Sequence, residues 1–365
     1  MVTEDEAMRR AVALAARGLG TTSPNPVVGC LLLGADGVVV GEGFHAYAGG
    51  PHAEIVALAQ AGERARGGTA VVTLEPCNHT GRTGPCARAL IGAGITRVVI
   101  AVDDPTPVAA GGAATLRAAG VQVETGVRRA EAEAGNVAWL TAVRRARPYV
   151  TWKFAATLDG RSAAADRTSQ WVTAAPARGD VHRLRSTVDA IVAGVGTVLA
   201  DDPQLTVRDL RDGSLAIKQP LRVVVDTNGR TPEKARVRDV AAPTWIATAA
   251  EVGAGADGRV DLSALLAALY GRGVRNVLLE GGPTLAGAFL AAGLVDLVIG
   301  YVAPKLLGAG LPALVDAGVT TIGEAIDLDF IDIARIGPDL RFTASLRQKP
   351  SDHPTHHPRS NWSAS

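Results

Sequence analysis

The chain has 365 residues, of which 47% are hydrophobic, and this is enough to form two compact domains. Its 37 Lys and Arg residues balance 36 Asp and Glu residues, so it lacks the positive charge of a dedicated nucleic-acid binder. No apolar run reaches the roughly 18 residues of a membrane span, the N-terminus opens with acids, and three cysteines are too few for a disulfide framework. We therefore expect a cytoplasmic protein with reduced thiols that acts on a small molecule.

Hydrophobic periodicity predicts alternating helices and strands over the first 140 residues. Helical spacing indicates a helix from Glu6 to Arg17, and VVGCLLL and GVVVGEG indicate a β-hairpin turning at Gly34–Gly37. Further helices are predicted in PHAEIVALAQAG, PCARALIGAG and AATLRAAG, and strands in TAVVTLEP, RVVIAVDDP and VQVETGV. This pattern indicates a layered α/β domain that ends near Leu140, with a polar linker at Ala142–Pro148.

A second alternating series begins at Tyr149 and predicts another α/β unit. Its apolar runs, each followed by Gly, Asp or Pro, are YVTWKFAATLDG, DAIVAGVGT, LRVVVDT, APTWIATA, RNVLLEGG and LVDLVIGYVAP. We place the two domains at residues 1–145 and 146–348. Residues 349–365 lack apolar periodicity and are rich in Pro, Ser and His, so we expect a disordered tail with solvated histidines.

A metal site is predicted from His52-Ala53-Glu54, Pro76-Cys77 and Pro85-Cys86. One imidazole and two thiolates suit Zn²⁺ and leave a fourth position for water. We expect each ligand beside a helix N-terminus, which favours the thiolate form. Glu54 is not a ligand and is placed to carry protons between water and a leaving amine. Taken singly, these residues could instead be buried hydrophobic cysteines and a helix cap, as we expect for Cys30 within VVGCLLL.

The cysteine spacing separates this chain from other zinc deaminases. Their signature, H-x-E…P-C-x-x-C, is kept here except that eight residues instead of two separate the cysteines. A tRNA or nucleoside deaminase with an unrelated C-terminal extension would have the short spacing and, for tRNA, a basic surface. A second alternative is a non-catalytic zinc-stabilised binding protein, which would close the metal with a fourth protein ligand and would not need Glu54.

The segments TSPNPVVGC, GEGFHAYAGGPHAE and VTLEPCNHTGRTGPCARAL resemble the deaminase half of the bifunctional riboflavin-biosynthesis deaminase/reductase family. The resemblance implies a cytidine-deaminase-like fold that removes the 2-amino group of 2,5-diamino-6-ribosylamino-4(3H)-pyrimidinone 5′-phosphate as ammonia. It also implies that the pyrimidine pocket is lined by Asn25, His45, His79 and Arg82, which could otherwise be turn or loop residues. The chain departs from the family pattern at Asn78, where Ser is usual, and at DPTP (Asp104–Pro107), where DPNP is usual.

From Tyr149 onward, KFAATLDGR, SQWVT, DAIVAGVGTVLADDPQLTVR and LLEGGPTLAGAFL resemble the reductase half of the same family. The resemblance implies a dihydrofolate-reductase-like fold in which NADPH reduces the ribosyl group to a ribityl chain. Independently, Gly194-Val195-Gly196 and Gly281-Gly282 follow apolar strands and precede helices, where backbone N–H groups can hold phosphate. Neither completes a G-x-G-x-x-G motif.

Position by position, the resemblance implies NADPH contacts at Ala155, Trp171, Thr197, Asp201, Thr227, Gly282, Pro283, Thr284, Leu285, Ala286, Gly287 and Ala288. It implies substrate contacts at Lys153, Ser169, Arg185, Leu205, Arg208 and Glu280. From the residues alone, Trp171 and Leu205 would be core residues and the arginines solvated charges. The expected partners are phosphorylated pyrimidines, with neither nucleic acid nor membrane, and the sequence leaves open whether the chain forms a homo-oligomer.

Overall fold

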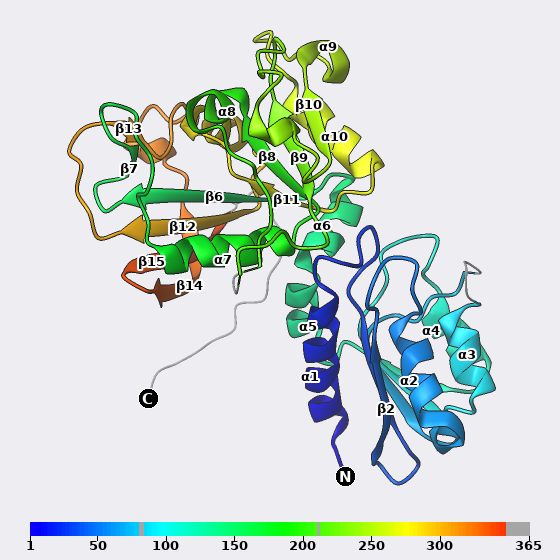
Figure 1. The fold of residues 1–365 in the computed structure, drawn as a ribbon. Helices are drawn as coiled ribbons and strands as arrows, with labels where there is room; N and C mark the ends of the chain where they lie inside the picture. Colours follow the sequence, from blue (N-terminus) through cyan, green and yellow to red (C-terminus); the bar gives the residue numbers. More distant parts are fainter. Residues whose placement is uncertain (80–83, 210–211, 348–365) are drawn as a thin grey trace.

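The computed structural model describes residues 1–79, 84–209 and 212–347. Within these ranges the strands form a five-stranded sheet, an eight-stranded sheet and a two-stranded ribbon. Figure 1 shows the two large sheets in separate lobes, the first built from the N-terminal third of the chain and the second from the remainder. The predicted succession of two α/β units is confirmed.

The first lobe is a sheet with the strand order β2-β1-β3-β4-β5. Its strands are β1 (Gly29–Leu33), β2 (Val39–Phe44), β3 (Thr69–Leu74), β4 (Arg97–Val102) and β5 (Gln122–Thr125). Its helices are α1 (Glu4–Ala15), η1 (Ala16–Gly18), α2 (Ala53–Ala61), η2 (Gly62–Ala65), α3 (Cys86–Gly92), α4 (Gly112–Ala118), α5 (Arg129–Gly135) and α6 (Val137–Arg145). β1 is antiparallel to β2 and β3, whereas β3, β4 and β5 are parallel.

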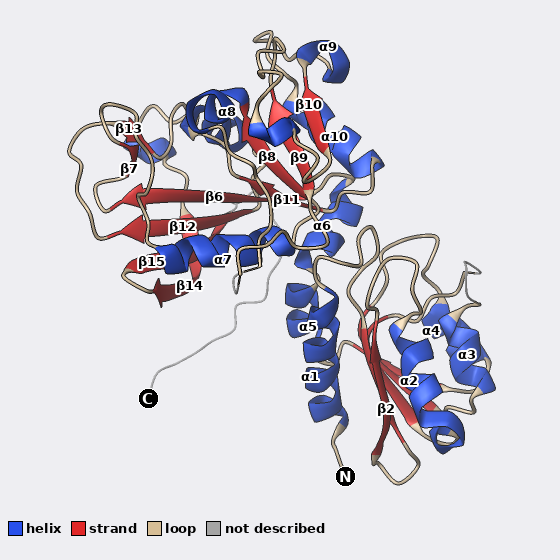
Figure 2. Ribbon diagram, viewed as in Figure 1, coloured by secondary structure: helices blue, strands red, loops and turns tan. Residues whose placement is uncertain are grey.

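Helices cover both faces of this sheet, with α1 and α5 on one side and α2, α3 and α4 on the other (Figure 2). Along β1, Leu31 and Leu33 pack on the α1 side, while Cys30 and Leu32 pack on the α2 side, as the two-residue period of a strand requires. Cys30 is therefore a core residue, as predicted.

Glycines in β2 set the position of α2. A Cβ added at Gly43 would lie 2.4 Å from the carbonyl oxygen of Ala53, the first residue of the helix. Only a glycine allows the start of α2 to approach the sheet so closely. The helix start that follows His52 is thereby fixed against β2.

The second lobe has the strand order β10-β9-β8-β11-β6-β12-β15-β14. Its strands, with those of the ribbon, are β6 (Tyr149–Thr157), β7 (Arg161–Ala163), β8 (Ala190–Gly194), β9 (Leu221–Val225), β10 (Thr244–Ala247), β11 (Asn276–Leu279), β12 (Leu297–Ala303), β13 (Leu311–Pro312), β14 (Leu328–Ile336) and β15 (Asp339–Leu346). Its helices are α7 (Ala175–Ser186), α8 (Val195–Asp201), η3 (Arg236–Arg238), α9 (Ala249–Val252), α10 (Leu262–Gly271), α11 (Pro283–Ala291) and η4 (Ile322–Glu324). The first six strands in this order, from β10 through β9, β8, β11 and β6 to β12, are parallel to one another. β15 pairs antiparallel with β12, and β14 pairs antiparallel with β15.

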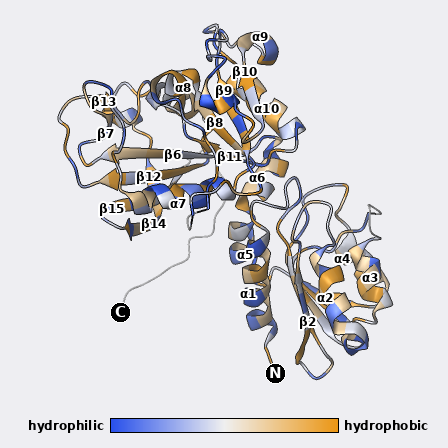
Figure 3. Ribbon diagram, viewed as in Figure 1, coloured by the Kyte–Doolittle hydropathy of each residue, from blue (hydrophilic) through white to orange (hydrophobic). Residues whose placement is uncertain are grey.

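The six apolar runs of the second series form β6, β8, β9, β10, β11 and β12, as predicted. Figure 3 shows that hydrophobic residues are concentrated in central strands such as β6 and β12 and in the covering helices α2 and α3. Every helix in the described ranges is too short or too polar to cross a lipid bilayer.

The prediction of a linker at Ala142–Pro148 is wrong for its first four residues. Residues up to Arg145 complete α6, and Ala142 is fully buried. The arginines that suggested a solvated linker are ion-paired: Arg145 and Arg147 both contact the carboxylate of Asp296, which is 6% exposed. The chain therefore passes into β6 through a fixed junction.

We expect Asp296→Ala to destabilise the second lobe by about 3 kcal/mol, because the change leaves the largely buried Arg147, 14% exposed, without its partner. Arg147 donates two hydrogen bonds to this carboxylate, of 2.7 and 2.8 Å, and the Val150 backbone N–H donates a third of 2.9 Å. Urea denaturation measures the loss. Asp329→Ala is the matched control, because the pair of Asp329 and Arg347 is more than half exposed and should contribute little. Equal effects of the two substitutions would contradict the assignment.

Candidate functional site

The three predicted metal ligands converge. One ligand atom from each of His52, Cys77 and Cys86 lies within 4.8 Å of the others. The Nδ1 atom of His52 lies 3.2 Å from the sulfur of Cys86 and 3.5 Å from that of Cys77. This spacing and donor set fit a single Zn²⁺ ion.

Local structure brings each ligand to this point. His52 caps α2 and Cys86 is the first residue of α3, so both lie at helix N-termini as expected. Cys77 lies in the loop after β3, and Pro76 begins no helix, yet the Cys77 sulfur accepts the backbone N–H of Cys86 at 3.4 Å. The first residue of α3 therefore supplies one cysteine ligand and binds the sulfur of the other through its backbone N–H.

The surroundings of the two cysteine thiols change their pKa values. The hydrogen bond between the thiols lowers the pKa of Cys77 below the usual thiol value and raises that of Cys86. His52 adds to the lowering at Cys77 through a further hydrogen bond. The lowered pKa favours the thiolate form of Cys77, and this is the form that binds zinc.

Glu54 lies beside the cluster in the first turn of α2 and is 3% exposed. Burial raises the pKa of its carboxyl to about 7. Glu54, His52 and Cys77 all line one cavity of about 750 Å³. A carboxyl group that readily exchanges a proton therefore faces the same space as the ligand cluster.

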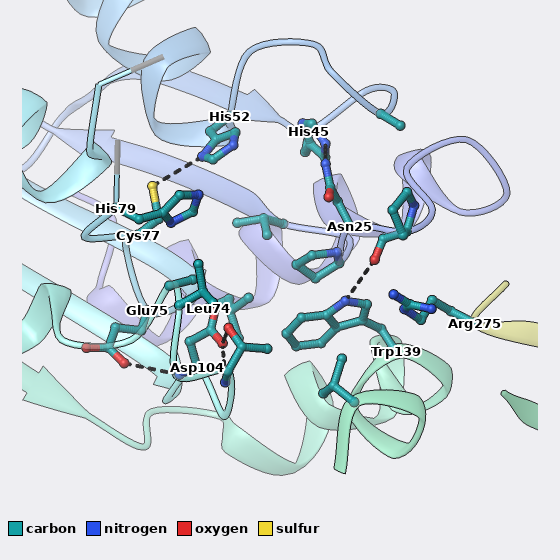
Figure 4. Close-up of a pocket in the computed structure, with 18 of the residues that line it drawn as sticks. Asn25, His45, His52, Leu74, Glu75, Cys77, His79, Asp104, Trp139 and Arg275 are labelled. Atoms are coloured by element: carbon teal, nitrogen blue, oxygen red, sulfur yellow. Dashed lines mark hydrogen bonds between the residues drawn. The ribbon is translucent and has the colours of Figure 1, made fainter. Parts of the chain in front are cut away.

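Three predicted pyrimidine-pocket residues, Asn25, His45 and His79, also line this cavity (Figure 4). The Asn25 amide contacts His45 Nε2 at 3.2 Å, and His45 Nδ1 lies 3.0 Å from the Pro51 carbonyl. These contacts fit a His45 ring that donates from Nδ1 and accepts at Nε2, and burial lowers its pKa. His79 Nδ1 is buried and has no partner among the described residues. Arg82, the fourth predicted residue, lies outside them.

The cavity has further lining residues that sequence reasoning did not assign to it. Glu75 and Asp104 follow the ends of the neighbouring strands β3 and β4, and Trp139 of α6 donates to the Pro24 carbonyl at 3.2 Å. Acidic residues one or two positions after the end of a parallel strand were a recognisable sequence signal for Glu75 and Asp104. Tyr270 and Arg275 come from the second lobe, and no local pattern indicates their presence here.

Most of the predicted reductase residues gather at the carboxyl ends of adjacent parallel strands in the second lobe. β9 leads to Thr227, β8 to Thr197 at the start of α8, and β11 to Glu280 and Gly282, while Lys153 lies in β6. This edge of a parallel sheet is where ligands of such folds bind.

Three charged residues form a buried cluster at this edge. Glu280 accepts two hydrogen bonds from Arg185, of 2.6 and 3.0 Å, and lies 3.7 Å from the Lys153 ammonium. Burial alone would raise the pKa of Glu280, but the charges of Arg185 and Lys153 lower it to about 2. Arg185 also donates to the Thr206 carbonyl at 3.0 Å, which brings the Leu205–Arg208 segment alongside. Arg185 is therefore not a solvated charge.

The predicted cofactor segment begins with Gly282 as the cap of α11. A Cβ at Gly282 would approach the Thr197 hydroxyl to 3.3 Å, so the two glycine-rich loops lie together. Gly287 has a packing role instead, because a Cβ there would lie 1.7 Å from the Val315 carbonyl oxygen. The Ser169 hydroxyl donates to Asp201 at 2.9 Å.

Trp171 and Leu205, predicted as cofactor and substrate contacts of the reductase, differ in their exposure. Trp171 is 61% exposed beneath the Arg178 guanidinium, so it is not a core residue, whereas Leu205 is buried. An exposed aromatic ring is available for contact with a ligand.

Comparison with known proteins covers both lobes. Residues 1–102 match the cytidine and deoxycytidylate deaminase zinc-binding region, and residues 148–342 match the RibD C-terminal domain. The riboflavin biosynthesis protein RibD of Mycobacterium tuberculosis is 48% identical over 94% of this chain and 97% of its own length. The RibD protein of Escherichia coli is 44% identical over 91% and 96%. The chain belongs to the RibD family.

Solved structures of the family agree with this fold. RibD of Acinetobacter baumannii has a TM-score of 0.84 at 39% identity and covers 94% of this chain and 99% of its own. A Thermotoga maritima protein, a diaminohydroxyphosphoribosylaminopyrimidine deaminase/5-amino-6-(5-phosphoribosylamino)uracil reductase, has a TM-score of 0.85 at 35% identity with the same coverage. The predicted cytidine-deaminase-like and dihydrofolate-reductase-like folds are confirmed.

As a RibD family member, the chain is a bifunctional deaminase and reductase of riboflavin biosynthesis. It combines a zinc-binding deaminase domain with an NADPH-dependent reductase domain. The alternatives of a tRNA deaminase with an unrelated extension and of a non-catalytic zinc protein are wrong, because both halves match one family over nearly the whole chain.

Proposed function

We propose that the first lobe deaminates 2,5-diamino-6-ribosylamino-4(3H)-pyrimidinone 5′-phosphate at its 2-amino group. The observation that carries this proposal is the convergence of His52, Cys77 and Cys86 beside the buried Glu54 in one cavity. Those three residues would hold Zn²⁺ and leave one coordination position free. When bound, zinc lowers the pKa of a water molecule and makes it a nucleophile near neutral pH.

Glu54 is the proposed proton carrier. Its carboxylate takes a proton from the attacking water and delivers a proton to the departing amine, which leaves as ammonia. The raised pKa of Glu54 suits both steps, since a carrier must accept and release the proton at similar pH. Asn25, His45 and His79 would orient the pyrimidine through hydrogen bonds to its polar edge.

The second lobe then reduces 5-amino-6-(5-phosphoribosylamino)uracil, opening the ribosyl group to a ribityl chain. NADPH supplies the hydride for this reduction. We assign its binding to the glycine-rich loops before α8 and α11, supported by Thr197, Thr227, Trp171 and Asp201 at the same edge of the sheet. Lys153, Ser169, Arg185, Leu205, Arg208 and Glu280 would form the substrate site beside it.

The substrate phosphate requires a cation in this reductase site, and we assign Arg208. The donors of Arg185 already engage Glu280 and Thr206, so its charge is largely neutralised. Arg208 is the last residue of the Leu205–Arg208 segment, and its backbone N–H donates to His182 Nδ1 at 3.2 Å. Its side chain donates to the Gly213 carbonyl and to Gln204 Oε1, two neutral partners that leave the positive charge available to an anion.

We therefore expect Arg208→Ala to lower the reductase kcat/KM for the deaminated substrate by about ten- to 150-fold, the range for hydrogen bonds to charged groups. The affinity for NADPH, measured by titration, should change little. Unchanged substrate kinetics would show that Arg208 is an ordinary surface arginine, and a loss confined to NADPH would assign it to the cofactor.

A coupled assay tests the whole proposal. The diaminopyrimidine phosphate should yield ammonia with or without NADPH, and NADPH oxidation should follow only after deamination. Ammonia release without subsequent NADPH oxidation would leave the reductase assignment unsupported. We further propose domain limits of 1–145 and 146–348 and a cytoplasmic location; the predicted tail at 349–365 lies outside the described residues.

A further inference from the structure

One wall of the deaminase cavity belongs to the reductase lobe. Tyr270 at the end of α10 and Arg275 just before β11 line the cavity with Asn25 and Trp139 of the first lobe. Figure 4 shows Arg275 beside Trp139, on the side of the cavity away from His52 and Cys77. The cavity is therefore completed only when both lobes are present.

Arg275 is held rigidly at this wall. Its Nη1 donates to the carbonyls of Tyr270 and Val274 at 2.9 and 3.2 Å, and its guanidinium stacks on the Tyr270 ring at 4.0 Å. Its Nε is buried and has no hydrogen-bond partner among the described residues. Both carbonyl partners of the guanidinium are neutral, so its positive charge is available to an anion in the cavity.

A single carboxylate joins this arginine to the pyrimidine pocket. Asp189 Oδ2 accepts the Ser23 hydroxyl at 2.8 Å and the backbone N–H of Arg275 at 2.9 Å. Ser23 lies two residues before Asn25 in the pocket. The position of Arg275 is thus coupled to the residues that face the base.

The charges along the cavity are asymmetric. Three acidic residues, Glu54, Glu75 and Asp104, line it, whereas Arg275 is its sole arginine or lysine among the described lining residues. A phosphate dianion is repelled by carboxylates and is bound strongly by the planar guanidinium of arginine. An anionic substrate would therefore direct its phosphate towards Arg275 and its base towards the ligand cluster.

We propose that Arg275, supplied by the reductase lobe, binds the 5′-phosphate of the deaminase substrate. This inference rests on the proposed function, because the phosphate belongs to the substrate assigned there. It makes Arg275 a specificity-determining residue for deamination. The reductase site should be little affected, because Glu280 lies at the opposite end of β11, roughly 16 Å away at about 3.3 Å per residue.

The test compares Arg275→Ala and Arg275→Lys, using ammonia release from the phosphorylated substrate and from the same compound without its phosphate. Arg275→Ala should lower kcat/KM for the phosphorylated substrate by about ten- to 150-fold, mainly through KM. The dephosphorylated compound should react equally slowly with both wild type and variant. Arg275→Lys should recover part of the loss, because it keeps the charge but not the planar fork.

Arg272→Ala is the matched control, because Arg272 stacks on Trp245 and does not line the cavity. It should leave both activities near wild type. Unchanged kinetics in Arg275→Ala, or an equal loss with both compounds, would overturn the proposal, the second result indicating a structural role. If the wild-type enzyme itself releases no ammonia from the phosphorylated substrate, the proposed function has failed instead.

Discussion

Glu54→Gln is expected to lower the rate of ammonia release by at least about 100-fold, the scale of general acid–base catalysis. The amide has nearly the same shape as the carboxyl group but cannot take up and release a proton near neutral pH. Glu54 is not among the clustered ligand residues, so zinc content should remain at the wild-type level. Ammonia assays and metal analysis of the same preparation measure both quantities.

The reductase provides an internal control for this variant. Reduction of the deaminated substrate should continue, because the residues of the second site lie in the other lobe. Glu63→Gln makes the same chemical change just beyond the end of α2, where the side chain is 94% exposed, and should leave deamination unaltered. Near-normal ammonia release by Glu54→Gln would refute the proton-carrier role.

The elements of both lobes could largely be predicted from sequence, because their signals are local. The apolar runs of β1, β3, β4 and β8 are fully or almost fully buried, and continuous hydrophobicity is typical of such central strands. The hairpin of β14 and β15 was not predicted. β14 lies at the edge of its sheet with most of its residues exposed, so no buried apolar run marks it.

The linker prediction failed for a physical reason that sequence does not reveal. Arg145 and Arg147 look like solvated charges until Asp296, about 150 residues later, is known to lie beside them. The position of such a partner depends on the fold of the second lobe, in which Asp296 directly precedes β12. Charge patterns can thus indicate exposure only when long-range partners are absent.

The metal ligands were readable because zinc restricts ligand type and because two of the three lie at helix starts. Arg275 was not readable. It stands before an ordinary buried strand, and its place in the deaminase cavity arises from the docking of one lobe on the other. When one domain contributes a residue to the site of another, its distance along the sequence from the motif of that site does not reveal their contact.

Removal of one metal ligand should lower deamination as much as Glu54→Gln does, but through loss of zinc instead of loss of the proton carrier. We expect wild-type protein to contain about one zinc per chain and Cys77→Ala to bind it at least about 100-fold more weakly, since even outer partners of metal ligands contribute up to that amount. Deamination should fall with the zinc content, whereas reduction should persist. Zinc content after dialysis against a chelator, followed by reconstitution, measures the change.

Cys30→Ala separates loss of a ligand from loss of a thiol. Cys30 lies in β1, is fully buried on the face of the sheet that α2 covers, and is not part of the ligand cluster. This variant should therefore keep its zinc despite a small packing defect. Zinc retained at wild-type affinity in Cys77→Ala would remove Cys77 from the metal site. Zinc lost equally from both variants would indicate that the defect is in folding, and the reductase activity of each preparation would then show whether the second lobe is intact.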